Sequence, residues 1–199
     1  MLKHLLVGSA LTFAAVAPAS AATLFNLGAP TGETASPGSY TYNFNAGAGA
    51  GSLAFQIQGY RTLDGSNCCT DILSVTLNSV LIFQGTYDLG GGGSNITFIN
   101  SGSGTVTPFT PGFGQGGTLT FSNGAVALVN GTNTITFAYS GAAQGIGDEA
   151  WGINTATITG NAFNAVPEPS AWALMILGFG VVGAGLRRSR KVRASLIFA

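Results

Sequence analysis

The chain has 199 residues, enough for one domain, with 31 glycines and only 7% charged residues, whereas ordinary soluble domains carry about 25%. Its 13 Phe, 5 Tyr and 2 Trp offer more apolar surface for burial than disordered chains have. The net charge is zero, but residues 22–165 carry six acidic side chains against one base, Arg61, a formal charge of −5. An acidic surface repels phosphate backbones, so the composition speaks against nucleic acid as a partner.

Residues 1–21 have the pattern of a secretion signal. A basic start precedes an apolar run over residues 5–17, and Ala19 and Ala21 form a small-residue cleavage site. The apolar run of about 13 residues is too short to span a membrane. We therefore predict cleavage by signal peptidase before Ala22, with the next residue as the alternative start of the mature protein.

The region 22–165 alternates apolar and polar residues with a period of two, which is typical of half-buried strands. The clearest runs are residues 40–44, 53–57, 73–77, 96–98, 119–121, 135–139 and 153–158. Turn-forming residues separate them at Asn78-Ser79, Gly90 to Gly93, Asn123-Gly124 and Asn130-Gly131, and Asn-Gly is a strong hairpin signal. Eight to ten short strands predict an all-β domain, an antiparallel β-sandwich of the jelly-roll kind.

The loop between the second and third of these runs contains Asp64, Asn67 and Asp71, and Asp148 and Glu149 follow later in the chain. Calcium binds hard oxygen ligands of this kind, so these five residues are the candidate metal ligands. The alternative is that Asp and Asn stabilise turns by bonding to their own backbone. We favour the turn interpretation, because calcium needs six to eight oxygens, and no cofactor is firmly implied.

Asp148 and Glu149 are adjacent, so in an extended segment their side chains would point to opposite faces. They fit either a loop cap or cation ligands beside Trp151. Trp151 could stack on a sugar, but its register with Ile153 favours a position in the hydrophobic core.

Cys68 and Cys69 are the only cysteines. In an oxidising compartment they would form a vicinal disulfide, which we favour, or each would pair with another chain. Zinc lacks enough ligands here, and a catalytic thiol lacks its base, because the only histidine, His4, leaves with the signal. We therefore expect no enzymatic activity.

Near the C-terminus, residues 171–186 form an uncharged apolar run, and five basic residues follow within seven positions. As a helix this run would rise about 24 Å, slightly less than the hydrocarbon core of a bilayer. Basic residues favour the cytoplasmic side. The pattern predicts a single transmembrane helix with a basic tail.

The residues around this run resemble the PEP-CTERM sorting signal in its PEPxxWA form. The matching residues are Pro167, Glu168, Pro169, Trp172, Ala173, Gly178, Gly180, Arg187, Arg188 and Arg190. The resemblance covers residues 166–193, and residues 194–199 form an extension without an assigned role. It implies an exosortase, a membrane-embedded cysteine transpeptidase, as partner. The precursor would be tethered in the inner membrane of a Gram-negative bacterium and then passed to the cell surface or extracellular matrix.

The sequences NGTNTITFAYSG and GIGDEAWGINTATITG, residues 130–141 and 145–160, are similar to the last two strands of jelly-roll domains in many PEP-CTERM proteins and carbohydrate-binding modules. Asn154 and Thr155 occupy positions where such domains have Asp-Asn, and some relatives use that Asp for a structural calcium. The resemblance therefore supports the fold more than any ligand.

The favoured function is a non-enzymatic exported protein of the cell surface or extracellular matrix, in a biofilm or envelope layer. The alternative is a carbohydrate-binding, calcium-dependent jelly-roll module with a polysaccharide ligand. More remote alternatives are a polysaccharide-active enzyme, which needs paired carboxylates, and an ice-binding protein, which the irregularly spaced Thr-x-Thr pairs do not favour.

Overall fold

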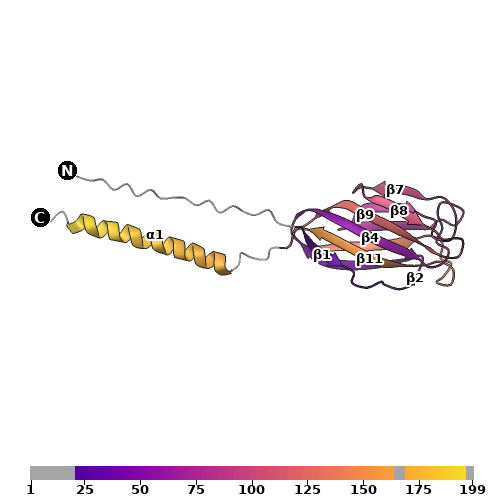
Figure 1. The fold of residues 1–199 in the computed structure, drawn as a ribbon, viewed down its shortest axis with the longest axis horizontal. Helices are drawn as coiled ribbons and strands as arrows, with labels where there is room; N and C mark the ends of the chain where they lie inside the picture. Colours follow the sequence, from indigo (N-terminus) through magenta and orange to yellow (C-terminus); the bar gives the residue numbers. More distant parts are fainter. Residues whose placement is uncertain (1–20, 164–168, 196–199) are drawn as a thin grey trace. The chain divides into compact units, whose positions relative to one another are not determined.

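A computed structural model of the chain describes residues 21–163 and 169–195, with side chains at 21–163 and 173–187. The chain divides into two compact units, Met1–Ala162 and Phe163–Ala199. The first contains the strands and the second a single helix (Figure 1). The predicted secretion signal, apart from Ala21, lies outside the described residues, as do Pro167 and Glu168. Their assignments remain predictions from the sequence.

Eleven strands and one helix make up the described secondary structure. Their bounds are β1 (Ala22–Asn26), β2 (Thr34–Ala35), β3 (Gly38–Ala46), β4 (Gly49–Gly59), β5 (Ile72–Leu77), β6 (Val80–Thr86), β7 (Ile96–Asn100), β8 (Thr105–Phe109), β9 (Gly117–Leu128), β10 (Gly131–Ser140), β11 (Ala150–Gly160) and α1 (Pro169–Ser195).

The strands form two antiparallel sheets that face each other across one hydrophobic core. The first has the order β1-β11-β4-β9-β8, with the short β2 also paired to β11, and the second has the order β3-β10-β5-β6-β7. The predicted all-β class and antiparallel sandwich are therefore confirmed (Figure 1).

The core follows from the alternation along the strands, because every second side chain points between the sheets. Phe55 of β4 lies at its centre, stacked on Phe121 with ring centroids 4.9 Å apart and edge-on to Phe137 at 5.3 Å. Phe83 completes the group at 5.8 Å from Phe55. Burial of each such ring stabilises the fold by about 1.5–3 kcal/mol, so this aromatic cluster holds the two sheets together.

Of the four predicted turns, three are confirmed, including Gly90 to Gly93 in the loop between β6 and β7, and one is wrong. Asn78 and Ser79 join β5 to β6 with φ of 51° and 66°, as a tight hairpin turn requires. Gly131 begins β10 directly after the β9–β10 hairpin. Asn123-Gly124, however, lies inside β9, where the register with β4 shifts. The positive φ of Asn123, 58°, makes a β-bulge rather than a turn.

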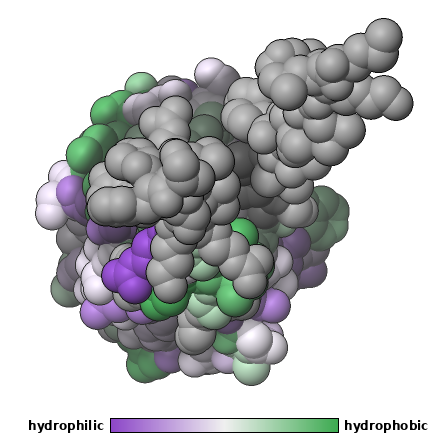
Figure 2. Space-filling model, turned by 90° about the vertical axis from the view of Figure 1, so that its left-hand side faces the viewer, coloured by the Kyte–Doolittle hydropathy of each residue, from purple (hydrophilic) through white to green (hydrophobic). Residues whose placement is uncertain are grey.

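The pairing places the two termini of the sandwich at one end, the attachment end, where Ala22 of β1 pairs with Gly160 of β11. Trp151, at the other end of β11, pairs with Gly59 at the end of β4. Ten steps along β11 separate the two ends by about 33 Å. We call the far end the distal end; it carries the loops 60–71 and 141–149. Figure 2 shows hydrophobic and hydrophilic residues intermixed on the visible part of the surface.

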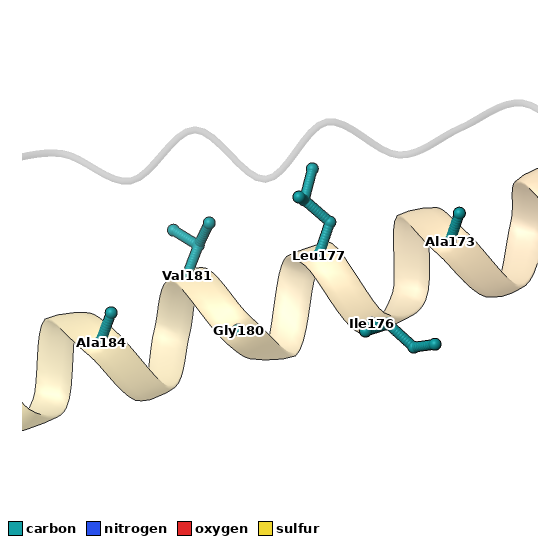
Figure 3. A pocket seen from close by; sticks show the side chains of 6 residues that line it. All are labelled: Ala173, Ile176, Leu177, Gly180, Val181 and Ala184. Carbon is teal, nitrogen blue, oxygen red and sulfur yellow. The ribbon is translucent and has the colours of Figure 1, made fainter.

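The helix α1 covers the predicted range 171–186 and continues to Ser195. Its described side chains are exposed, among them Leu174, Leu177 and Phe179. In Figure 3, Leu177 and Val181 project from one side of the helix. The helix is therefore confirmed. Within the part of the chain that the structure describes, no helix has the length and apolar character needed to cross a membrane, so α1 is not identified as a span.

Candidate functional site

Three acidic side chains meet at the distal end of the sandwich. Asp64 and Asp71 lie in the β4–β5 loop, and Glu149 immediately precedes β11. One oxygen from each carboxylate lies within 4.8 Å of the other two, and all three residues are buried. We call these three residues the acid cluster. Asp71 and Glu149 have no solvent exposure, and Asp64 is 7% exposed.

Asp71 holds this end of the fold together through both carboxylate oxygens. The buried Ser36 hydroxyl, just before β3, donates to Asp71 Oδ1 at 2.6 Å. The Asp64 backbone N–H donates to Asp71 Oδ2 at 3.0 Å, and the Asp71 N–H donates back to the Asp64 carbonyl at 3.2 Å. Hydrogen bonds to a charged acceptor contribute about 1.5–3 kcal/mol each. Asp71 therefore fixes the β4–β5 loop against the segment that leads into β3.

Glu149 is only partly satisfied. Its Oε1 accepts a hydrogen bond from Gln144 Nε2. Its Oε2 is buried and accepts no hydrogen bond from any residue that the structure describes, and the Glu149 carboxyl group lies within hydrogen-bonding reach of the Asp71 carboxylate. Burial, and then the nearby Asp71 carboxylate, raise the pKa of Glu149 to about 7. Burial is also the main cause that raises the pKa of Asp71 and of Asp64. In all three carboxyl groups, burial opposes ionisation more strongly than the neighbouring hydrogen bonds favour it.

No basic side chain of the sandwich balances these charges. Arg61 is the only Lys or Arg between residues 22 and 165. Its guanidinium lies 3.8 Å from Glu33 and donates to the Ile146 carbonyl at 3.1 Å. Three buried carboxylates without a cationic partner are costly, because burial of an unpaired charge requires either a proton or another cation.

The five predicted metal ligands are brought together only in part. Asn67 joins the acid cluster indirectly, because its Nδ2 donates to Asp64 Oδ1 at 2.5 Å. Asp148 is exposed and accepts a hydrogen bond from the Thr62 hydroxyl at 2.7 Å. Asp148 and Glu149 thus contact different groups, although they lie in a turn that precedes β11 and not in an extended segment. Whether any of these residues binds a metal stays a prediction.

The residues beside the acid cluster that the sequence did not single out are Ser36, Gln144 and Tyr139. The Tyr139 hydroxyl is buried and has no hydrogen-bond partner among the described residues. Burial, and then the Asp71 carboxylate, raise the pKa of the Tyr139 phenol. The sequence places Tyr139 in a predicted strand but gives no sign that it lies near the acid cluster. Nothing in the sequence predicts the contact between Ser36 and Asp71.

Trp151 is fully buried, with its ring centroid 5.2 Å from Tyr40 and 5.0 Å from Tyr139. Its Nε1 donates to the Ala35 carbonyl at 3.2 Å. The predicted core position is confirmed, and the ring is not available to stack on a sugar. Asn154 donates through Nδ2 to the side-chain oxygens of two glutamines of β4, at 3.0 and 3.2 Å. The Asn154 amide thus links β11 to two side chains of the neighbouring strand β4.

Cys68 and Cys69 lie in the loop next to Asn67. The structure has them as free thiols with their Sγ atoms 2.7 Å apart. Contact with Cys68 is the main cause that raises the pKa of Cys69 to about 11. The vicinal disulfide stays a prediction, and the contact shows that the two sulfurs already lie side by side.

The C-terminal segment forms the second candidate site. On α1, a shallow pocket is lined by Ala173, Ile176, Leu177, Gly180, Val181 and Ala184, side chains that are all apolar (Figure 3). It lies on the apolar part of the helix, before the basic residues that begin at Arg187. Its surface offers no polar group for catalysis.

Comparison with known proteins identifies this segment. Residues 165–191 match the PEP-CTERM protein-sorting motif. The chain therefore carries this motif at its C-terminus, as the sequence indicated, and the motif implies an exported protein that is sorted by an exosortase to the cell surface. No curated protein matches the chain.

Among solved structures, a chain described as "Structure of infectious bursal disease virus Gt strain" aligns with 74% of this chain at 11% identity and a TM-score of 0.32. The alignment spans only 33% of that chain. So low a similarity supports no inference about function.

Proposed function

We propose that this protein is a non-enzymatic component of the bacterial cell surface or extracellular matrix, in a biofilm or envelope layer, delivered there by exosortase processing at Pro167-Glu168-Pro169. The observation that carries the proposal is the match of residues 165–191 to the PEP-CTERM motif, downstream of a predicted secretion signal. On this proposal the β-sandwich is the delivered part and the C-terminal segment is the sorting device.

The apolar run 171–186 serves in this proposal as a temporary membrane tether. Its length of about 24 Å, together with the five basic residues that follow, fits a short helix anchored on the cytoplasmic side. The four glycines in the run favour a membrane over water, because each would cost a solvent-exposed helix about 1 kcal/mol. Processing at the PEP sequence would release the sandwich from this tether.

The architecture of the sandwich is consistent with a domain that is displayed on the cell surface. Its strand orders β1-β11-β4-β9 and β3-β10-β5-β6 correspond to the two four-stranded sheets of a jelly roll, extended at one edge by β7 and β8. Both chain ends leave from the attachment end, and Gly160 is only seven residues before Pro167. The distal loops thus lie at the end of the sandwich opposite to the one from which both chain ends leave.

A non-enzymatic role is also supported by the burial of the acid cluster. Glycosidases place two carboxylates about 5–10 Å apart on either side of a substrate, in a cleft that the substrate enters. Asp71 and Glu149 have no exposure to solvent, so no glycosidic bond could reach them in this conformation. A structural role for the cluster fits this burial better than a catalytic one.

The test is to express the Glu168→Ala variant in a host that contains the exosortase, with Asn164→Ala as the control just outside the matched residues. Antibodies against the sandwich would follow the protein in membrane, cell-surface and medium fractions. We expect Glu168→Ala to accumulate as a full-length precursor that resists alkaline extraction from membranes, whereas Asn164→Ala behaves as wild type. Equal surface delivery of both variants would refute the proposal.

A further inference from the structure

We propose that the acid cluster of Asp64, Asp71 and Glu149 is a binding site for a single divalent cation, calcium, which links the loops at the distal end of the sandwich. Two observations carry this inference. The first is the convergence of three buried carboxylates. The second is the buried Glu149 Oε2, which no described donor satisfies.

The geometry fits one ion. Calcium binds oxygens at 2.3–2.6 Å, so two ligands on opposite sides of it lie about 4.8 Å apart. The three carboxylates each offer an oxygen within 4.8 Å of the other two. One ion can therefore lie within reach of all three carboxylates. The remaining ligands would be second carboxylate oxygens or water, because calcium accepts six to eight.

The ligand chemistry favours calcium over other metals. All donors in the cluster are carboxylate oxygens, and the mature chain has no histidine, so the imidazole ligands that suit zinc or copper are missing. Magnesium demands near-octahedral geometry at about 2.0–2.1 Å and usually binds through one or two carboxylates, so it suits a set of three carboxylates less well than calcium does. Calcium tolerates irregular geometry and bidentate carboxylates, such as those of neighbouring loop residues.

The balance of charges in the sandwich also favours a bound cation. The ion would leave one negative charge in place of three, in a domain whose only base, Arg61, already contacts Glu33 and Ile146. Asp71 connects the cluster to Ser36, and Glu149 connects it to Gln144. One bound ion would thereby join three segments: the start of β3, the β4–β5 loop and the β10–β11 loop.

The site also suits an exported protein. Extracellular calcium modules bind with Kd values of roughly 10⁻⁴–10⁻³ M, which the medium can saturate. The loops of the distal end would then become fully rigid only after export. This inference rests on the sandwich alone, so it can fail or hold independently of sorting by the exosortase.

The experiment uses the full-length exported chain, purified in detergent and stripped with EDTA, and measures the melting temperature as CaCl₂ is added. For a domain of this size we expect a rise of about 5 °C when calcium is tenfold above its Kd. Tb³⁺ provides a second readout, because Tyr139 and Trp151 lie next to the cluster and should sensitise its luminescence. Calcium should displace it.

The decisive variant is Glu149→Gln, which keeps the shape of the side chain and the contact with Gln144 but removes one charge. In EDTA it should melt at or above the temperature of the wild type, because repulsion within the cluster falls. In calcium it should lose the stabilisation. Asp64→Asn serves as a second variant, and Glu33→Gln, an exposed acid outside the cluster, should keep the full response. No calcium-dependent change in the wild type, or a full response in Glu149→Gln, would overturn the proposal.

Discussion

Replacement of Asp71 by alanine tests the role of its carboxylate in stability directly. The substitution removes the acceptors for the Ser36 hydroxyl and the Asp64 N–H, which are bound at 2.6 and 3.0 Å. Both donors are buried, so each loses a charge-assisted hydrogen bond of about 1.5–3 kcal/mol. We expect the free energy of unfolding to fall by about 3–5 kcal/mol, which corresponds to about 10–15 °C in melting temperature.

Asp71→Asn is the matched variant. An amide can accept from the Asp64 N–H through its oxygen and donate to the Ser36 oxygen through its nitrogen. It should therefore lose only about 1 kcal/mol, although it carries no charge. The comparison separates the hydrogen bonds of Asp71 from its electrostatic role, provided that both variants are measured in EDTA.

The assay is urea unfolding followed by the fluorescence of Trp151, the only tryptophan between residues 22 and 165. Trp151 is fully buried at the same end of the sandwich, so its emission should report loss of the native state. A loss below 1 kcal/mol for Asp71→Ala would refute the reasoning. Equal losses for the alanine and asparagine variants would refute it as well.

Two further predictions concern other parts of the sandwich. Gly104→Ala would place a Cβ 2.3 Å from the Phe121 ring and should cost about 1–3 kcal/mol in urea unfolding, whereas Gly147→Ala, with no atom within 4 Å, should change stability by no more than about 0.5 kcal/mol. For Cys68 and Cys69, we expect protein isolated from the oxidising side of the membrane to weigh about 2 Da less than its reduced form. Two thiols that react with Ellman's reagent in denaturant, without prior reduction, would contradict the vicinal disulfide.

The fold was predictable from the sequence wherever one face of a strand is buried, because burial imposes alternation on the residues. The runs around Phe55 and Phe137 show this and lie in β4 and β10. β6 escaped prediction because Val80–Phe83 is an unbroken apolar run without a period of two. Asn123-Gly124 was misassigned because the same residue pair satisfies a hairpin turn and a bulge, and only the register with β4 distinguishes them.

The candidate site was predictable by residue type and not by arrangement. Asp64 and Asp71 share one loop, so their proximity followed from the sequence. Glu149 lies about 80 residues further on, and its meeting with Asp71 depends on the antiparallel pairing of β4 with β11. Its neighbour Asp148 has the same chemistry but faces Thr62. A difference of one position along the chain thus decides which of the two carboxylates enters the acid cluster.

The most direct test of sorting at the PEP sequence is the intact mass of the mature protein from cells with and without the exosortase. With the enzyme, the account predicts a chain that starts at Ala22 and lacks the residues after the PEP sequence. Without it, the same N-terminus should be joined to a chain that still contains residues 170–199. A chain that retains residues 170–199 in both kinds of cell would contradict processing at this motif.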